Sequence, residues 1–467
     1  MIESIPLSTS TNLRSCLDQL GTLLGDRLGF GQALREQHSH GESWHPGALP
    51  DAVCFPRSTE EVCEIVKVCA SHSVPLIPFG AGTSLEGNVH ADRGGVCVDL
   101  SQMNTIVDVH TEDFDCQVQA GVTRRQLNEY LRDTGLFFPV DPGADATIGG
   151  MASTRASGTN AVRYGTMREN VLGLTVVTAN GKAMKVGTRA RKSSAGYDLK
   201  SLFVGAEGTL GIITEVTLRL YPMPEAMSAA VVNFPDVESA TKAAITTIQF
   251  GIPIARVELM DKQYMGAVNG YSKTDYLERD TLFLEFHGTE AWVAEQAEQF
   301  GEIAAEFGGG DFQWAVKEED RRKLWRARHN AYYAGLAMSP NGKGYVTDVC
   351  VPISRLSESI EAVRKDLAET NLVSPILGHV GDGNFHLTIF IDTDDAESLK
   401  DAEQLNLRLV KRAIEMGGTC TGEHGVGSGK LKSMKLEHDQ ESLELMRVLK
   451  QTLDPQNIFN PGKVVSI

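Results

Sequence analysis

Three glycine-rich loops beside short apolar runs constrain the fold of this chain more than any other feature. The first spans 79–88 and follows the apolar run 74–79. Glycines let consecutive backbone N–H groups turn toward a pyrophosphate, so such loops can bind nucleotide cofactors. No Gly-Lys-Ser/Thr follows, which excludes a P-loop. The G-x-G-x4-G spacing, followed by a strand at 95–100 instead of a helix, does not fit a Rossmann fold.

Two later segments repeat this composition. One spans 141–153 and leads into 156–165, and the other spans 203–214 and ends in a strand at 215–221. Both are rich in Gly, Ser and Thr and poor in charge, which suits a groove that holds a cofactor by main-chain and hydroxyl hydrogen bonds. The alternative is that all three loops are only turns of a β-rich domain.

Length and charge restrict the class of protein. A chain of 467 residues is expected to form two or three domains. A net charge of −17 argues against nucleic acid or anionic lipid as the main partner. We find no signal-like segment and no run long enough to be a transmembrane segment. The expected location is therefore cytoplasmic, and a peripheral place at the inner membrane is compatible with it. Eight cysteines without C-x-x-C pairing predict buried, reduced thiols.

The expected helices and strands define a boundary at Pro222-Met223-Pro224. Before it, Ser58 with Glu61 three residues later predicts a capped helix start. After it, strands alternate with helices in the manner of an antiparallel α+β domain. The predicted helices are 11–36, 58–70, 236–250, 290–307, 316–336 and 443–453, the predicted cap strands are 228–233 and 281–287, and a closing turn spans 457–463.

The segment 376–390 places two histidines on a predicted hairpin. An apolar run, Gly-Asp-Gly-Asn and a second apolar run predict two strands joined by a tight turn. His379 and His386 then lie one on each arm and can face one metal ion. Glu423, in a glycine-bounded loop, could supply a third ligand, and His424 would remain as a base. Alternatively, both histidines are ordinary polar residues at a sheet end.

These motifs together resemble a known family. The segments 139–145, 158–168 and 347–352 add to the three loops, the hairpin and the Glu423-His424 pair. The chain resembles flavoproteins of the vanillyl-alcohol oxidase type, and more closely the FAD-dependent D-lactate dehydrogenases of the D-2-hydroxy-acid dehydrogenase group, which are related to the glycolate oxidase flavoprotein subunit. The resemblance implies an α+β fold with a vanillyl-alcohol oxidase/PCMH-type FAD-binding domain and an antiparallel-sheet cap domain. The expected parts are a helical segment at 1–50, the FAD-binding domain at 51–222, the cap with the metal site at 223–425, and a return to the FAD domain at 426–467.

The resemblance also implies the cofactors. No histidine within 80–88 matches a covalent flavin attachment, so non-covalent FAD is expected, together with one divalent metal ion, Zn²⁺ or Mn²⁺, on His379, His386 and Glu423. The expected FAD contacts are Pro78, Gly80, Ala81, Gly82, Thr83, Ser84, Pro142, Gly143, Thr147, Gly149, Gly150, Ser157, Gly158, Tyr164, Gly165, Glu207, Gly208, Gly211, Ile212, Ile213 and Asn460.

Four residues are expected to bind substrate. Arg328 shares a helical stripe with apolar residues and should point inward, where a substrate carboxylate would accept its forked donors. Lys343 is assigned only because relatives place a carboxylate-binding lysine there. Relatives that oxidise larger diacids tend to carry Thr and Asn at the positions of Tyr332 and Thr388. This departure favours D-lactate over D-2-hydroxyglutarate.

The expected reaction is FAD- and metal-dependent oxidation of D-lactate, or a similar small D-2-hydroxy acid, to the 2-oxo acid. His424 takes the hydroxyl proton, the hydride passes to flavin N5, and the electrons pass to a cytochrome, a quinone or an electron-transfer flavoprotein. A homodimer is compatible with this reading. The alternatives are a glycolate oxidase flavoprotein subunit, a D-2-hydroxyglutarate dehydrogenase, and a metallohydrolase in which the glycine loops are only structural.

Overall fold

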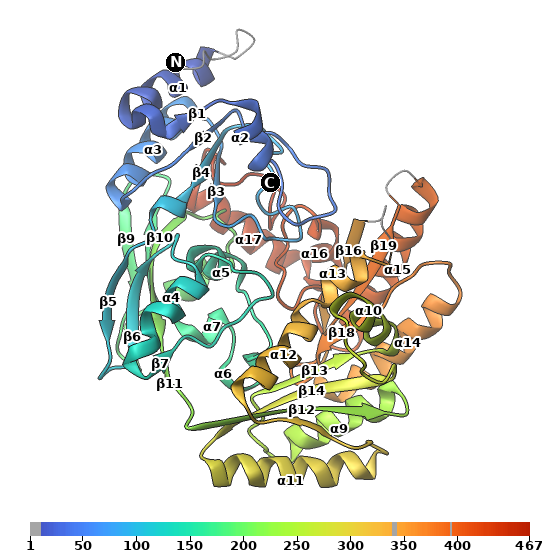
Figure 1. The fold of residues 1–467 in the computed structure, drawn as a ribbon. Coiled ribbons are helices and arrows are strands. Elements are labelled where there is room, and N and C mark those ends of the chain that lie inside the picture. The colour runs from blue at the N-terminus through green and yellow to red at the C-terminus, as the bar shows by residue number, and fades with distance from the viewer. Residues whose placement is uncertain (1–10, 339–342, 393–394) are drawn as a thin grey trace. The chain divides into compact units, whose positions relative to one another are not determined.

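The computed structural model describes residues 11–338, 343–392 and 395–467 (Figure 1). The chain divides into two compact units. The first contains the residues up to Ser157, Thr166–Met223 and Glu423–Ile467, and the second contains Gly158–Gly165 and Pro224–Gly422. The first unit is therefore assembled from three separate pieces of chain.

A four-stranded sheet of the first unit carries the first glycine loop. Its order is β1-β2-β4-β3, with β2, β4 and β3 parallel and β1 antiparallel to β2. The described residues between β3 and β4 contain no helix, which confirms that this loop does not belong to a Rossmann fold. The strands are β1 (Leu28–Gly29), β2 (Ala52–Cys54), β3 (Leu76–Phe79) and β4 (Val96–Asp99).

A five-stranded antiparallel sheet forms the second layer of strands in the first unit, and the third glycine loop leads into its strand β10. Its order is β5-β6-β10-β8-β9, and α5 packs on β10. Its strands are β5 (Ile106–His110), β6 (Asp115–Gln119), β8 (Val171–Val177), β9 (Ala183–Gly187) and β10 (Ile212–Arg219). A separate short pair is formed by β7 (Leu136–Phe137) and β11 (Tyr221–Pro222). The helices of the first unit are α1 (Thr11–Leu24), α2 (Gln32–Gln37), α3 (Thr59–His72), α4 (Arg124–Leu131), α5 (Ile148–Thr154), α7 (Met167–Asn170), α8 (Leu199–Phe203), α16 (Leu431–Glu437) and α17 (Gln440–Leu453).

The end of one helix and the start of another can be compared with their predicted positions in this unit. The expectation of one helix over 11–36 is wrong, because α1 ends at Leu24 and Gly25 takes a φ of +59°. The chain then forms β1, in which Leu28 pairs with Cys54. At α3, the Ser58 side chain accepts a 3.3 Å hydrogen bond from the backbone N–H of Glu61, as predicted.

The C-terminal segment completes the first unit. The backbone N–H of Leu76 in β3 donates to the carbonyl of Ile458 at 2.7 Å, and that of Asn460 donates to the carbonyl of Leu76 at 2.8 Å. Lys450 is 3% exposed and donates from Nζ to the Asp454 carboxylate and to two backbone carbonyls. The predicted closing turn therefore extends the edge of the sheet that carries the first glycine loop.

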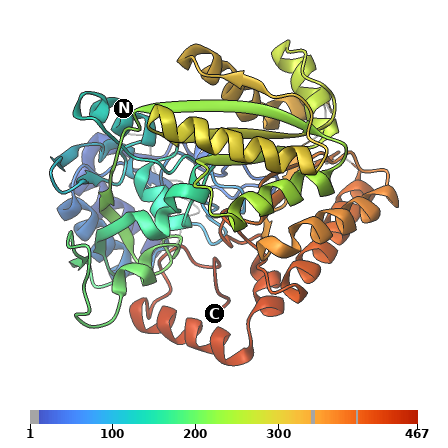
Figure 2. The same ribbon diagram turned by 90° about the horizontal axis from the view of Figure 1, so that it is seen from below.

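The second unit is built on one antiparallel sheet of eight strands, with β17 pairing beside β19. Its order is β15-β12-β14-β13-β18-β19-β16. The helices α9 and α11 lie side by side across one face, and α10, α12 and α13 cover the other (Figures 1 and 2). The strands are β12 (Ala226–Phe234), β13 (Arg256–Met260), β14 (Asp280–Gly288), β15 (Gln313–Ala315), β16 (Lys343–Val346), β17 (Val349–Cys350), β18 (Ile376–His379) and β19 (Asn384–Ile391), and the helices are α6 (Ala161–Tyr164), α9 (Val237–Gln249), α10 (Lys262–Ser272), α11 (Glu290–Glu306), α12 (Glu318–His329), α13 (Ala331–Leu336), α14 (Leu356–Ala368) and α15 (Ala396–Glu415).

The predicted hairpin and the predicted helix 316–336 have different outcomes. Strands β18 and β19 pair antiparallel, with Leu377 opposite His386 and His379 opposite Asn384, so the hairpin is confirmed. The helix is wrong as a single element. It divides into α12 and α13 at Asn330, whose ψ of −3° departs from helical geometry and caps both segments.

Two further observations concern the chain as a whole. All eight cysteines lie in the described part of the chain and are free thiols, most of them buried, as predicted. Within the described residues, no helix combines the length and the apolar character that crossing a membrane requires.

Candidate active site

The two hairpin histidines are held in the same tautomer. Nδ1 of His379 donates to Oε1 of Glu258 at 2.7 Å, and Nδ1 of His386 donates to the carbonyl of Thr347 at 2.9 Å. A carboxylate and a carbonyl only accept, so both neutral rings keep their lone pair on Nε2. The ring centroids lie 5.5 Å apart. Adjacent imidazoles whose Nδ1–H groups are both tied down are the usual arrangement of metal-ligating histidines, so this donor set fits a divalent metal ion.

Glu258 connects His379 to the arginine expected to bind substrate. It is fully buried, and its Oε2 accepts a 2.6 Å hydrogen bond from Nη2 of Arg328. Burial would raise the pKa of this carboxyl, but His379 and Arg328 together hold it below its ordinary value. Arg328 lies on the buried face, as its spacing predicts, with 7% exposure. Its Nε has no hydrogen-bond partner among the described residues.

The other expected substrate residues lie in the same unit. Thr388 follows His386 by two positions in β19, so both side chains point to one face of the sheet. The Thr388 hydroxyl accepts a 2.6 Å hydrogen bond from the phenol of Tyr264, whose pKa is raised by burial. Tyr332 is half-buried and lies against Gly344, where an added Cβ would come within 3.0 Å of its ring. Lys343 is exposed and is the first residue of β16.

A buried aspartate holds the segment of chain that precedes Glu423. Asp348 is 1% exposed and accepts hydrogen bonds from Nδ2 of Asn384 and Oγ1 of Thr421, both at 2.8 Å. A Cβ on Gly422 would collide with the Asn384 side chain, so only glycine fits there. Glu423 directly follows Gly422 in the sequence. The second unit ends at Gly422, and the first unit resumes at Glu423.

His424 lies in the first unit beside a buried glutamate. Its Nδ1 donates to Oε1 of Glu86 at 3.1 Å, and Nζ of Lys430 lies 3.2 Å from the same oxygen. Glu86 is 6% exposed. The carboxylate fixes the His424 proton on Nδ1 and leaves Nε2 as the proton-accepting atom, which is the orientation that a general base needs.

The three glycine loops converge in the first unit. An added Cβ on Gly80 would collide with Oγ1 of Thr147, and one on Gly208 would lie 2.8 Å from Cγ of Pro78. Gly82 has a φ of +69°, which turns the loop sharply. Residues far apart in the sequence therefore form one close-packed lining of backbone and small side chains.

Orphaned polar atoms indicate that this lining fits FAD. Among the described residues, Oγ of Ser84 and Oδ1 of Asn460 are buried and have no hydrogen-bond partner. Nδ2 of Asn460 donates to the carbonyls of Asn88 and Glu207, both at 2.8 Å, which fixes its orientation. Buried polar atoms are nearly always satisfied, so these two are consistent with a bound polar cofactor.

Glu207 has a structural contact set. Its carboxylate accepts hydrogen bonds from the backbone N–H groups of Val426 and Gly427, at 2.6 and 2.9 Å, and from Nδ2 of Asn88 at 2.5 Å. Burial raises its pKa. Its side chain therefore anchors the loop that follows His424.

The remaining expected FAD contacts divide between the units. Gly158, Tyr164 and Gly165 lie in the short segment that belongs to the second unit, where the Tyr164 phenol donates to Nδ1 of His287 at 2.8 Å. Those in the first unit are Pro78, Gly80, Ala81, Gly82, Thr83, Ser84, Pro142, Gly143, Thr147, Gly149, Gly150, Ser157, Glu207, Gly208, Gly211, Ile212, Ile213 and Asn460.

Three residues of these clusters were not predicted from the sequence: Glu86, Glu258 and Tyr264. Glu258 and Tyr264 sit in ordinary strand and helix patterns, and their partners follow 70 or more residues later. Glu86 lies within the first glycine loop, which was the available signal for it.

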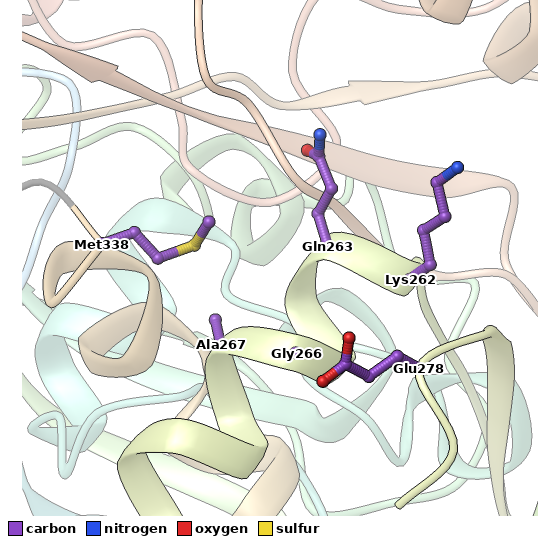
Figure 3. A pocket seen from close by; sticks show the side chains of 6 residues that line it. All are labelled: Lys262, Gln263, Gly266, Ala267, Glu278 and Met338. Carbon is purple, nitrogen blue, oxygen red and sulfur yellow. The ribbon is translucent and has the colours of Figure 1, made fainter.

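One surface pocket is unrelated to these clusters. A shallow pocket of about 330 Å³ lies on α10 and is lined by Lys262, Gln263, Gly266, Ala267, Glu278 and Met338 (Figure 3). It contains none of the expected site residues, so it carries no argument about function.

Comparison with known proteins identifies the class. The family model for "FAD binding domain" matches residues 50–187, and that for "FAD linked oxidases, C-terminal domain" matches 223–464. The solved structure of p-cresol methylhydroxylase superposes with a TM-score of 0.76 over 98% of each chain, at 16% identity. The fold and the site therefore define a FAD-linked oxidase of the vanillyl-alcohol oxidase/PCMH type, as expected.

Two curated relatives are much more similar in sequence. The "probable D-lactate dehydrogenase, mitochondrial" of Danio rerio is 52% identical over 96% of this chain and 90% of its own length. The "D-lactate dehydrogenase [cytochrome], mitochondrial" of Arabidopsis thaliana is 46% identical over 97% and 80%. The chain belongs to the family of FAD-dependent D-lactate dehydrogenases. A metallohydrolase with purely structural glycine loops does not fit this family.

The same relatives correct one expectation. Both are mitochondrial by name, so the expectation of a cytoplasmic protein is wrong and the comparison points to a mitochondrial one. Composition and apolar runs do not distinguish a cytoplasmic from a mitochondrial protein, which is why the expectation was wrong.

Proposed function

We propose that this FAD-dependent enzyme oxidises D-lactate to pyruvate with the help of a divalent metal ion. The proposal of a metal site rests on the pair His379 and His386, whose Nδ1–H groups both donate to acceptors within the protein. Glu423 completes the proposed ligand set, and Zn²⁺ or Mn²⁺ accepts two imidazoles and a carboxylate. When bound, the metal would lower the pKa of the substrate hydroxyl, and FAD would supply the acceptor for the hydride from C2.

Arg328 is proposed to bind the substrate carboxylate. Its buried guanidinium keeps one N–H donor without a partner among the described residues, and a carboxylate is the natural acceptor for it. Thr388 and Tyr332 would limit the space for the substrate side chain, and Lys343 is retained as a weaker second contact for the carboxylate. A methyl group suits this setting better than a second carboxylate, which supports D-lactate over a diacid.

His424 is proposed as the general base. Glu86 holds its Nδ1–H, so Nε2 receives the hydroxyl proton and the carboxylate stabilises the imidazolium that forms. The electrons then leave for an acceptor. The name of the Arabidopsis relative supports a cytochrome as this acceptor. A quinone and an electron-transfer flavoprotein are the alternatives, and a homodimer stays compatible with this proposal.

The first test is an anaerobic visible spectrum of the purified protein, titrated with D-lactate and then L-lactate, before and after EDTA. We expect D-lactate alone to bleach the flavin band, and EDTA to abolish the bleaching. Equal bleaching before and after exhaustive metal removal would contradict the metal role. Faster bleaching by glycolate than by D-lactate would instead support the glycolate oxidase alternative.

The second test addresses the base. His424→Ala should retain FAD and metal but reduce the rate of flavin reduction by about 100-fold or more, in line with the usual contribution of a general base. His438→Ala, which changes a histidine at the end of α16, is the matched control and should keep the rate. Unchanged flavin reduction in His424→Ala would remove this residue as the base.

A further inference from the structure

We infer that Glu258 is a positioning residue that serves both halves of the substrate-binding machinery, by orienting the metal ligand His379 and the carboxylate-binding Arg328 with its two oxygens. This inference rests on the proposed function, because it uses the roles proposed there for His379 and Arg328. Neither the sequence pattern nor the comparisons assign a role to Glu258.

The two contacts are separate and well formed. Glu258 lies in β13, whose next residues Leu259 and Met260 pair with β18. Its Oε1 accepts from Nδ1 of His379 in β18 at 2.7 Å, and its Oε2 accepts from Nη2 of Arg328 in α12 at 2.6 Å. The carboxylate is fully buried, so water does not compete for either oxygen. One side chain therefore links a strand and a helix that carry different functional groups.

The contact with His379 sets the ligand chemistry. A carboxylate on Nδ1–H fixes the tautomer, holds the ring orientation and increases the basicity of Nε2. His386 has a neutral carbonyl in the same place. The Asp348 carboxylate lies 3.8 Å from Nδ1 of His386, beyond hydrogen-bond distance. The two imidazoles therefore differ, since the Nδ1–H of His379 donates to a carboxylate and that of His386 donates to a carbonyl. Loss of the Glu258 charge should weaken metal binding through His379.

The contact with Arg328 sets the substrate chemistry. A buried guanidinium needs a counter-charge, and Glu258 supplies it when no substrate is bound. The bond uses Nη2 and leaves the buried Nε–H without a partner among the described residues. Arg328 is therefore held in one orientation with a donor available for an anion, which reduces the cost of ordering it when the substrate binds.

The chain contains a matched control on the neighbouring strand. Glu285 in β14 is also buried and also contacts a histidine, His287, and an arginine, Arg256. It lies in no proposed metal or substrate contact. A general effect of removing a buried carboxylate should therefore occur in both variants, whereas an effect on metal and substrate should occur only at Glu258.

The experiment compares Glu258→Gln with Glu285→Gln in the FAD-loaded full chain. Gln can still accept from His379, but it lacks the charge and presents an amide N–H₂ toward Arg328. We expect Glu258→Gln to bind Zn²⁺ or Mn²⁺ about 10-fold to 100-fold more weakly, measured by competition with a chelating dye, as for other groups that orient metal ligands. We also expect its KM for D-lactate to rise about 10-fold with a smaller change in kcat. Glu285→Gln should change metal affinity and KM by less than about twofold.

Glu258→Asp tests the same idea if the Gln variant folds poorly. It keeps the charge but is one methylene shorter, so it can reach only one partner well, and its metal affinity should lie between wild type and Glu258→Gln. Metal affinity and KM within twofold of wild type in Glu258→Gln, or equal losses in both Gln variants, would overturn the inference. A wild-type chain that binds no metal would instead overturn the proposed function.

Discussion

Two buried glutamates on neighbouring strands each contact one histidine and one arginine. They differ in the residues that surround these partners. Glu258 in β13 contacts His379 and Arg328. Glu285 in β14 contacts His287 at 2.8 Å and Arg256 at 3.5 Å. A carboxylate between a histidine and an arginine is therefore not by itself a sign of function in this unit.

The neighbours of the two histidines make the difference. His287 donates from Nε2 to Glu285 and accepts the Tyr164 phenol at Nδ1, so both nitrogens are bound within the protein. His379 stands beside a second imidazole, that of His386. Glu285 also accepts the indole N–H of Trp325 at 2.5 Å, which adds a third fixed donor. Glu285 thus belongs to a closed polar cluster, and Glu258 to one that presents a pair of imidazoles.

The largest effect that separates the two clusters is metal loss. His379→Ala should lose bound metal and lower D-lactate oxidation by about 100-fold or more, because two ligands hold a divalent ion far less well than three. Metal per chain by elemental analysis and the rate of flavin reduction are the measurements. His287→Ala is the control and should keep its metal. Metal loss in both variants would mean that the clusters do not differ in the proposed way.

A smaller effect concerns pH. The pKa of Glu285 is about 2, because Arg256 and His287 outweigh the effect of burial, whereas its ordinary value is 4.5. A carboxyl whose pKa is lowered on folding stabilises the folded state above the ordinary value, and this stabilisation is lost as the pH falls toward 2. At pH 6, Glu285→Gln should lower the free energy of unfolding by about 3 kcal/mol, the usual cost of breaking a buried ion pair.

The difference between wild type and Glu285→Gln should shrink as the pH falls from 4.5 to 3, because Glu285 takes up a proton in the unfolded chain while it stays ionised in the folded protein. Urea unfolding across this range measures it, with the exposed Glu238→Gln as a surface control. A difference that stays constant with pH would show that the ionisation of Glu285 does not stabilise the fold.

The smallest effect tests the phenol that closes the Glu285 cluster. Tyr164→Phe leaves Nδ1 of His287 buried without its donor, and losing one such hydrogen bond costs about 1 kcal/mol in the free energy of unfolding. Urea denaturation of the FAD-loaded protein measures the change. Tyr333→Phe, at a position that is 55% exposed, is the matched control and should change the free energy of unfolding by less.

The hairpin and the cap strands were predictable because their signals are local. Alternating apolar residues around Gly-Asp-Gly-Asn define β18, the turn and β19, and this fixes His379 and His386 on paired arms. The end of α1 at Leu24 could not be predicted in the same way. The leucine spacing continues past Gly25, but the positive φ of Gly25 and the pairing of β1 with β2 end the helix there. The division at Asn330 was missed for a similar reason, since asparagine is tolerated in a helix and also caps one.

The partners of the site residues could not be read from the sequence. Periodicity indicates that Arg328 is buried, but the anion that it contacts comes from a strand 70 residues earlier. The same limit applies to Glu86, which contacts His424 across 338 residues. Such pairings depend on how the strands are ordered in the sheet, and a single sequence carries no direct signal of that order.

The way the chain enters and leaves the first unit has a consequence for its synthesis. Most of the second unit is one continuous stretch, Pro224–Gly422, whereas the first unit needs Glu423–Ile467 to pair with β3. On a ribosome, the cap sheet can therefore form while the unit with the FAD loops still lacks its last segment. Contacts between such distant residues close late and slowly, so flavin loading should follow the synthesis of Glu423–Ile467.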